Sequence, residues 1–556
     1  MRQTSVRIAK SFRHGGMVSF IGQMLAYGRF AFGLRRYLME QATPEIGRHM
    51  IEQRQRNREA NLLTMVKRAI YEYEASPYLS LLRHAGCEHG DFERMVRSDG
   101  IDATLMRLRD AGVYVTIEEF KGKQPLVRGS TVFQCRPHDF DNPFLHRSIR
   151  TASSGTRGAG TQTTVNLERS RHSALSHAVA LSAHGISGSP TVLWLPILPS
   201  SAGFGMLLQS SKMGVPPLRW FSPVAARAVR PSLAKRLATL YVVYAGRLFG
   251  ARMPVPEYVS GDQITVVADS LLAVLHRGHG CVVFSTPSSA VRVCQAVQAA
   301  GHDLTSATFV VSGEALTPAK MAELRCAGAD AVNLYAFAEG GIVGFGCADA
   351  SKPAVDDIHL LSGAHGVVLR RRDIPFGGGT VDAFLFTTLL DKAPKVLLNV
   401  ESGDYGALES RDCSCEFGDI GLTTHLHSIR SFDKLTGEGM TFVGTDLVRI
   451  VEEVLPARFG GASTDYQMLE SEDSRGNTRL DVIVSDDVGE VDEQGVISLV
   501  LSELRKGSDT NRMMAEVWRE QGVVKVRRGQ PCVTAGGKLL PLHISREGRS
   551  DRIPVT

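Results

Sequence analysis

The sequence predicts an α/β protein. A large N-terminal domain with mixed or parallel sheets flanked by helices precedes a small, mobile α+β C-terminal domain. Three observations predict this architecture. The chain has 556 residues, which is too long for one ordinary domain. Apolar strand patterns alternate with helix patterns between residues 281 and 335, and a second series of such patterns begins near residue 434. Because 43% of the residues are hydrophobic, a large core can form.

Residues 1–59 are predicted to form a basic helical extension. No acidic residue precedes Glu40, whereas the basic residues before it are Arg2, Arg7, Lys10, Arg13, Arg29, Arg35 and Arg36. Residues 17–39 are apolar but interrupted by glycines, and they lack the small-residue cleavage site of a secretory signal. A basic amphipathic helix can lie on an anionic membrane. We favour docking on the protein itself or on a second subunit, because each glycine weakens an isolated helix by about 1 kcal/mol.

The next segments lead from helices to a polar loop. Residues 45–85 are predicted to be helical, with Leu62, Val66 and Ile70 at helical spacing. Residues 153–164 read SSGTRGAGTQTT, and their hydroxyls and glycine N–H groups suit a flexible anion-binding loop. A solvated linker has the same composition. A helix over 169–185 and a buried strand over 191–198 follow.

The clearest architecture lies between residues 281 and 335. Apolar, β-branched runs predict strands over 281–285, 307–312 and 331–335. Helices are expected over 287–301 and 317–328, the second with Thr317 as N-cap and Pro318 as its first residue. Such alternation predicts a parallel sheet with right-handed crossovers. Ligands then bind beyond the carboxyl ends of the strands, at residues 285–289, 312–315 and 336–341.

The C-terminal third continues with strands over 380–408. An amphipathic helix is expected over 446–455, a strand over 480–487, and a helix or a strand over 496–508. Residues 523–544 complete the small domain.

Composition excludes several classes of protein. The formal net charge of +5 is mild, and no basic cluster is interleaved with aromatics, so we expect no nucleic-acid partner. Nine cysteines over this length are not a disulfide framework, which fits a reducing, cytoplasmic compartment. No apolar run is long enough to predict a transmembrane segment.

Four short motifs occur in a fixed order along the chain: SSGTRGAG, LYAFAEGG, ESGDYG and TAGGKLLPL. This series resembles the adenylate-forming superfamily of acyl-CoA synthetases and adenylation domains, over roughly residues 60–545. Within it the chain looks most like phenylacetate–CoA ligases, which share the loop Ala152–Thr156 and the strand end Thr286–Ser288. The resemblance implies a large adenylate-forming domain over 60–432 and a small domain over 433–556 that carries the catalytic lysine.

The resemblance also assigns the nucleotide site. A loop would wrap the β- and γ-phosphates of ATP; it comprises Ser153, Ser154, Gly155, Thr156, Arg157 and Gly158. The family usually has a lysine at the place of Ala159, so Arg157 would supply the missing charge. Gly313 and Glu314 would form the adenine edge, and Tyr335 would pack on or near the adenine.

The remaining family residues would bind magnesium, ribose and the reacting groups. Glu339 would ligand Mg²⁺ together with ATP oxygens. Asp404 would accept both ribose hydroxyls, with Arg430 as a second ribose contact. Asp433 or Lys434 would be the hinge. Without the resemblance, each of these residues has an ordinary structural interpretation. Glu339 then caps a loop, Asp404 lies in a turn, and Lys538 is a solvated side chain.

The implied reaction is ATP-dependent activation of a small carboxylic acid. An acyl-AMP intermediate would form and then react with a thiol, either coenzyme A or the phosphopantetheine of an acyl carrier protein. Lys538 would stabilise negative charge during adenylation. Phe204, Phe284 and Phe337 suggest an apolar or aromatic acid, although packing within helices and strands explains these rings equally well. Transfer to an amine or hydroxyl, or a degenerate adenylation fold without catalysis, are the alternatives. A homodimer through the N-terminal helices is a further expectation from the family.

Cysteine and histidine spacing suggests a metal site. Some phenylacetate–CoA ligase relatives carry a structural zinc between the segments that contain Cys347, His359, Cys413 and Cys415. Three thiolates and one imidazole suit a closed tetrahedral Zn²⁺ site. His365, His425 and His427 are rival ligands, and buried free cysteines are the alternative.

Overall fold

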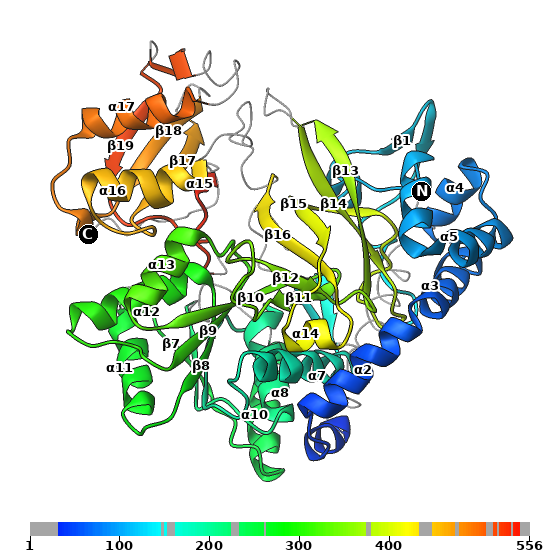
Figure 1. The fold of residues 1–556 in the computed structure, drawn as a ribbon, viewed down its shortest axis with the longest axis horizontal. Coiled ribbons are helices and arrows are strands. Elements are labelled where there is room, and N and C mark those ends of the chain that lie inside the picture. Colours follow the sequence, from blue (N-terminus) through cyan, green and yellow to red (C-terminus); the bar gives the residue numbers. More distant parts are fainter. Residues whose placement is uncertain are drawn as a thin grey trace, which may run out of the picture.

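The computed structural model confirms the α/β class (Figure 1). It describes residue 30 and residues 32–145, 149–152, 162–198, 200–223, 233–260, 263–373, 380–432, 447–472, 478–506, 515–516, 518–519, 522–534 and 537–544. A large mixed sheet with helices on its faces makes up most of the molecule. A smaller α+β unit with its own core lies beside it (Figure 1).

The large sheet has twelve strands among the described residues. In spatial order they are β13 (His365–Asp373), β14 (Thr380–Thr388), β15 (Val400–Ser410), β16 (Thr424–Ser431), β12 (Ile358–Leu360), β11 (Gly341–Gly346), β10 (Asp330–Phe337), β9 (Ala307–Ser312), β8 (Cys281–Ser285), β5 (Thr191–Trp194), β6 (Arg219–Ser222) and β7 (Pro256–Tyr258). The strands from β10 to β7 are parallel, and the others pair antiparallel. The sheet therefore changes character between β10 and β11.

Helices cover both faces of the parallel half. The main helices are α7 (Leu167–Ala183), α8 (Ser201–Lys212), α10 (Leu233–Leu248), α11 (Ile264–Leu275), α12 (Pro287–Ala299) and α13 (Pro318–Cys326). On β8, Val282 and Phe284 face the core formed with α7 and α8, whereas Val283 faces the core with α11 and α12. Burial on both faces explains why these strands are continuously apolar.

The predicted strands 281–285 and 307–312 match β8 and β9, and Thr317 caps α13 by accepting from the Lys320 N–H. The strand expected over 191–198 is shorter, because β5 ends at Trp194. Pro196 follows and has no N–H to donate to a sheet.

The N-terminal helices pack on the rest of the large domain. They are α2 (Pro44–Arg56), α3 (Arg58–Val66), a π-helical turn (Lys67–Tyr71), α4 (Pro77–His84), α5 (His89–Asp110) and α6 (Ile117–Phe120). Helix α2 lies along α7, and Gly47 is needed there because a side chain would strike the Leu175 carbonyl oxygen. Tyr37 donates to the Leu208 carbonyl at 3.1 Å. The described part of the basic extension thus docks on its own chain.

Four short strands and one short helix complete the large domain. These are β1 (Leu126–Arg128), β2 (Thr131–Phe133), β3 (Ile149–Ala152), β4 (Gln162–Val165) and α14 (Glu416–Asp419). β3 and β4 form a hairpin, and the predicted loop 153–158 between them lies outside the described residues.

The small unit contains a four-stranded sheet in the order β19 (Val524–Arg528), β18 (Thr478–Val484), β17 (Tyr466–Glu472) and β20 (Leu542–Ile544). Its helical segments are α15 (Leu447–Arg449), a π-helical turn (Ile450–Val454), α16 (Leu455–Phe459), a 3-10 turn (Asp486–Val488) and α17 (Glu493–Leu504). The segment that the sequence left open between helix and strand is therefore a helix. Asp433 and Lys434, the expected hinge, lie outside the described residues.

The small unit contacts the large one through a buried ion pair. Glu452 accepts from Lys320 Nζ at 2.7 Å and from Thr317 Oγ1 at 2.5 Å, and all three side chains are buried. The Ser463 N–H donates to Glu323 at 2.8 Å nearby. Figure 1 shows the small unit above α12 and α13. Within the part of the chain that is described, we find no helix with the length and apolarity needed to cross a bilayer.

Candidate active site

A cavity of about 1160 Å³ lies at the carboxyl ends of the parallel strands. The loops after β8, β9 and β10 line it, at the places predicted from the sequence. All of the described residues assigned to the nucleotide and the reacting groups contribute to its lining: Gly313, Glu314, Tyr335, Glu339, Asp404, Arg430 and Lys538. Residues distant in sequence, from both structural units, therefore share one cavity.

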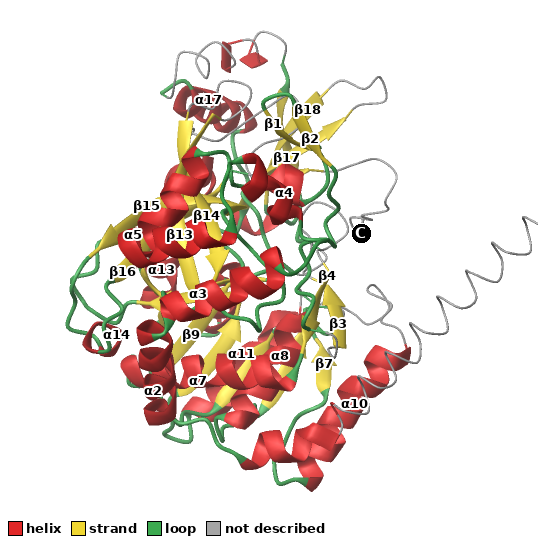
Figure 2. Ribbon diagram, turned by 90° about the vertical axis from the view of Figure 1, so that its right-hand side faces the viewer, coloured by secondary structure: helices red, strands yellow, loops and turns green. Residues whose placement is uncertain are grey.

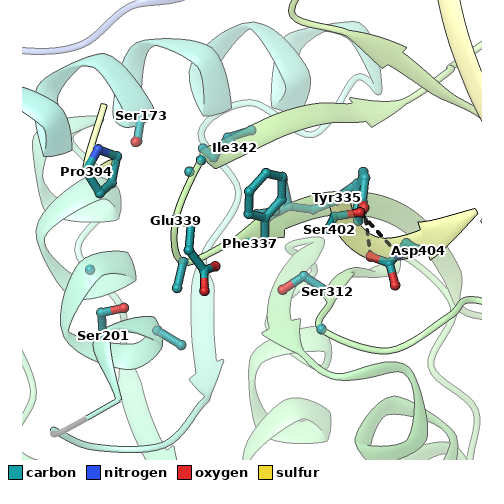
Figure 3. Close-up of a pocket in the computed structure, with 18 of the residues that line it drawn as sticks. Ser173, Ser201, Ser312, Tyr335, Phe337, Glu339, Ile342, Pro394, Ser402 and Asp404 are labelled. Atoms are coloured by element: carbon teal, nitrogen blue, oxygen red, sulfur yellow. Dashed lines mark hydrogen bonds between the residues drawn. The ribbon is translucent and has the colours of Figure 1, made fainter. Parts of the chain in front are cut away.

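Tyr335 and Asp404 meet although three strands lie between β10 and β15 in the order of the sheet (Figure 3). Tyr335 on β10 donates its hydroxyl to Asp404 Oδ2 on β15 at 2.7 Å. Burial raises the pKa of Tyr335 well above its ordinary value, so the phenol keeps its proton and donates. The Asp404 backbone is also held, because its N–H donates to Ser402 Oγ at 3.2 Å. This pair fixes the orientation of an acceptor-only carboxylate at the cavity wall.

Arg430 stands on the strand beside Asp404. The register pairs Asp404 with Ser431 and Tyr405 with Arg430. The Arg430 guanidinium donates to Asp356 at 3.1 Å, and Asp356 also accepts the Ile429 N–H at 2.9 Å. Asp356 is buried, so its carboxylate holds the Arg430 guanidinium in place.

Gly313 and Lys538 are in close contact. A Cβ on Gly313 would lie 2.9 Å from both Cε and Nζ of Lys538, and Gly313 has φ of +87°. Only glycine fits there, for space and for conformation. Lys538 sits in a tight turn, in which its N–H donates to Thr534 Oγ1 at 3.1 Å. The small unit thus places its lysine against the loop that follows β9.

Glu314 connects the two units beside this lysine. Its Oε1 accepts the Leu539 N–H at 2.9 Å and the Ser288 hydroxyl at 2.9 Å, and its Oε2 accepts the Ser288 N–H at 3.1 Å. The carboxylate is therefore engaged at the start of α12 and at the residue after Lys538. The adenine contact expected for Glu314 stays a prediction.

Glu339 follows β10 and points into the cavity. Figure 3 shows its carboxylate directed toward the space between Ser201 on α8 and Ser312 at the end of β9. The Phe337 ring covers Gly340, where a Cβ would come within 2.5 Å of the ring. A free carboxylate edge that faces open space beside hydroxyls is suited to a hard cation such as Mg²⁺.

The other end of the cavity is lined by residues of α7, α8, β8 and β11. Met206, Phe284 and Ile342 are apolar, whereas α7 contributes mainly serine and histidine side chains. Two buried histidines also line it. His177 Nδ1 lies 2.9 Å from the Ser173 carbonyl, and His365 Nε2 lies 2.9 Å from the Ile342 carbonyl. Burial lowers the pKa of each to about 4, so both are neutral at pH 7.

A carbonyl only accepts, so the bonded nitrogen of each ring carries the proton. The other nitrogens, His177 Nε2 and His365 Nδ1, are then acceptors. Both are buried, and neither finds a hydrogen-bond partner among the described residues. Sequence reasoning did not place either histidine in the pocket. His177 lies in a helical apolar run, a pattern that ordinarily indicates a core residue.

The four predicted metal ligands come together at a separate place. Their ligand atoms all lie within 4.8 Å of one another. Cys413 Sγ is 3.9 Å from Cys347 Sγ, 3.3 Å from Cys415 Sγ and 3.3 Å from His359 Nε2, and Cys415 Sγ is 3.1 Å from the same nitrogen. A tetrahedral site with Zn–S bonds of about 2.3 Å has S···S edges of about 3.8 Å. The cluster has nearly these dimensions.

The surroundings of the cluster favour metal ligation. His359 Nδ1 lies 2.6 Å from the Leu422 carbonyl, which fixes the tautomer that leaves Nε2 as an acceptor toward the thiols. Two of the rival histidines are engaged elsewhere, since His365 bonds the Ile342 carbonyl and His427 bonds Ser428. His425 bonds Asp357 at 3.1 Å and forms with Asp357 and Cys347 a second group whose ligand atoms lie within 4.8 Å of one another.

Comparisons with known proteins were made for the whole chain. No protein-family model matches the sequence, and no curated protein matches it. Solved structures that match in fold include a 2-hydroxyisobutyryl-CoA ligase in complex with 2-HIB-AMP and CoA (13% identity, 89% of this chain and 90% of that chain, TM-score 0.42). An O-succinylbenzoate coenzyme A synthetase from Bacillus subtilis, in complex with ATP and magnesium, matches at 12% identity over 79% and 80% of the two chains, with a TM-score of 0.41.

An anthranilate CoA ligase in complex with anthranoyl-AMP matches at 12% identity over 84% of this chain and 89% of that chain, with a TM-score of 0.41. At these values the matches do not establish the family of this chain.

Proposed function

We propose that this protein is an adenylate-forming ligase that activates a small carboxylic acid with ATP and transfers the acyl group to a thiol. One observation carries the proposal. A lysine from the small C-terminal unit, Lys538, reaches the same cavity as Glu339 and Asp404. A lysine in a glycine-rich turn is ordinarily solvated, whereas Lys538 contacts Gly313 of the large unit at this cavity. The order of the motifs along the chain supports the same reading.

In the proposed first step, a carboxylate oxygen of the acid attacks the α-phosphorus of ATP, and pyrophosphate leaves. Asp404 would accept the two ribose hydroxyls, held in place by Tyr335 and flanked by Arg430. Lys538 would stabilise the negative charge that develops between the acid and the α-phosphate. The close contact of Lys538 with Gly313 supports a role at this step.

Glu339 is the proposed ligand for Mg²⁺, together with the phosphate oxygens of ATP. When bound, Mg²⁺ neutralises the phosphate charge and favours departure of pyrophosphate. The loop Ser153–Gly158 would hold the β- and γ-phosphates, with Arg157 supplying a positive charge.

In the second step a thiol attacks the acyl carbon and AMP leaves. Coenzyme A and the phosphopantetheine of an acyl carrier protein are the proposed acceptors, as in phenylacetate–CoA ligases, which the sequence resembles. A rotation of the small unit about residues 433–434 would exchange Lys538 for the thiol between the steps. Transfer to an amine or hydroxyl is the second candidate. The two are distinguished by whether added coenzyme A consumes the acyl-AMP.

The proposed acid is apolar or aromatic, and Met206, Phe284 and Ile342 would supply the apolar part of its site. The unpaired nitrogens of His177 and His365 are fully buried, so they are not proposed as acceptors for the acid.

We propose that Cys347, His359, Cys413 and Cys415 hold a structural zinc ion. Four ligands would complete its shell and leave no open position for a substrate. The bound ion would tie the loop that carries Cys413 to β12, which carries His359. Zinc here would stabilise the fold and take no part in the reaction.

Pyrophosphate exchange tests the proposed function. Labelled pyrophosphate should enter ATP only in the presence of a suitable acid, and a panel of aryl, short-chain and amino acids identifies it. If no acid supports exchange in folded protein that binds ATP, the protein is a non-catalytic adenylation fold.

A further inference from the structure

The exposed side of α10 has an unusual composition for a surface helix. Its buried side, with Val242 and Val243, packs into the core of the large domain. The side away from the core carries large apolar and aromatic residues at helical spacing: Leu237, Leu240, Tyr241, Tyr244 and Leu248. Leu248 is 85% exposed and Leu237 is 55% exposed. Water therefore meets a stripe of leucine and tyrosine instead of the polar face expected of such a helix.

This stripe continues beyond the helix. Phe249 follows it directly and is also exposed, and Leu218 and Val255 lie beside Arg247 at a shallow pocket near the end of α10. We call the whole surface the α10 patch; it comprises Leu218, Leu237, Leu240, Tyr241, Tyr244, Leu248, Phe249 and Val255. Figure 2 shows α10 at the periphery of the molecule. None of these residues lines the proposed active-site cavity.

The charges around the α10 patch are predominantly positive. Arg236, Arg247 and Arg252 are exposed at its borders, and the Arg247 guanidinium lies 5.4 Å from the centre of the Tyr244 ring. No aspartate or glutamate occurs in the sequence between Glu168 and Glu257. Glu257 lines the shallow pocket with Arg247 and Arg252, but its carboxylate is paired with Arg219. The patch is therefore apolar with a positive balance of charge.

This distribution of charge indicates which kind of partner could bind the α10 patch. In a symmetric dimer through this surface, the arginines of two copies would meet, and the one carboxylate of the shallow pocket, Glu257, is already paired with Arg219. The N-terminal segment of the chain is equally unsuited, because it too is basic and has no acidic residue before Glu40. The partner must supply negative charge together with an apolar interior. A bilayer with anionic headgroups has both.

We propose that the α10 patch binds the surface of an anionic lipid bilayer. The leucines would enter the boundary between headgroups and acyl chains, and Tyr241 and Tyr244 would lie at headgroup level, where tyrosine is favoured. Arg236 and Arg252 would contact the lipid phosphates, each strengthening binding by about fivefold. The helix would lie in the plane of the surface and would not cross it. This inference is independent of the proposed ligase activity.

Co-sedimentation of the full-length protein with vesicles tests the inference. The wild-type chain should bind vesicles of phosphatidylcholine mixed with an equal amount of phosphatidylglycerol, and it should bind phosphatidylcholine alone at least about tenfold less tightly. High salt should weaken the binding. The triple variant Leu237→Glu, Tyr244→Glu, Leu248→Glu should reduce the partition coefficient by at least about tenfold.

A matched control isolates the patch from net charge and from the basic N-terminus. The variant Met106→Glu, Val132→Glu, Val266→Glu adds the same three charges at exposed apolar sites elsewhere and leaves the N-terminal segment unchanged. It should bind like the wild type. Thermal unfolding of each variant checks that the fold is intact.

Four results would overturn the inference. The first three are an absence of wild-type binding to the anionic vesicles, equal binding by both triple variants, and a dimer in sedimentation velocity that the α10 variant alone dissociates. The third result would show that a second copy covers the patch. Capture of a specific acidic protein by the wild type without vesicle binding would also contradict it.

Discussion

Replacing Glu314 with alanine should slow adenylation without abolishing substrate binding. Among the three hydrogen bonds that the carboxylate accepts, only the bond from the Leu539 N–H, at 2.9 Å, joins the small unit to the large one. A hydrogen bond to a charged acceptor contributes about 1.5–3 kcal/mol. Since about 1.4 kcal/mol corresponds to a factor of ten, the population with Lys538 in place should fall by about ten- to a hundredfold.

The assay is acid-dependent pyrophosphate exchange at varied ATP. Because Lys538 would act in the transition state, kcat should fall by about ten- to a hundredfold, and loss of the expected adenine contact of Glu314 would appear separately as a higher KM for ATP. Ser288→Ala is the matched control. It removes a hydroxyl from the same carboxylate but keeps the Leu539 contact, and its kcat should stay within about threefold of the wild type. An unchanged kcat in Glu314→Ala, or an equal loss in Ser288→Ala, would refute the reasoning.

Three further predictions concern stability. Glu452→Gln leaves Lys320 buried and unpaired, so we expect a loss of about 3–5 kcal/mol in the free energy of unfolding; a second change, Lys320→Met, should restore part of it in a denaturant titration. His177 and His365 have folded pKa values of about 4, whereas the pKa of a histidine in the unfolded chain is about 6.5. The free energy of unfolding should therefore decrease as the pH is lowered from about 6.5 to about 4, by up to about 1.4 kcal/mol per pH unit for each histidine. A profile that stays flat over this range would contradict the assignment. Elemental analysis should find about one zinc per chain, and Cys413→Ser should lower both the zinc content and the melting temperature; a metal-free protein of unchanged stability would end the zinc proposal.

Much of the fold could be predicted because the parallel half of the sheet is buried on both faces. Continuous apolar runs such as 281–285 and 307–312 then coincide with strands, and Pro287 and Pro318 mark the helix starts. The antiparallel half was harder to read. Its strands, such as β13 with three consecutive arginines, alternate irregularly, since Arg370 and Arg372 pair with the buried Glu401.

Residues that line the cavity could be predicted from the sequence where each belongs to a short motif. Tyr335, Glu339, Asp404 and Lys538 come from separate motifs, and the structure places them around one cavity. Contacts between residues that are distant in the sequence have no motif from which they could be predicted. The bonds of Glu314 to Ser288 and Leu539 arise from chain segments brought together only by folding.

The histidine acceptors are a second feature that the sequence could not supply. Whether His177 is a core residue or a pocket residue depends on which helix face meets the cavity. Which of its nitrogens is free depends on the Ser173 carbonyl one turn earlier. Neither property has a sequence pattern of its own.

The central claim is that Lys538 acts in adenylation within this cavity. The most direct measurement is acid-dependent exchange of pyrophosphate into ATP by the wild type and by Lys538→Ala, with Lys525→Ala, a lysine on β19 of the same small unit, as control. The account predicts exchange in the wild type and the control, and a loss of at least about a hundredfold in Lys538→Ala with ATP binding retained. Equal exchange by all three proteins would contradict it.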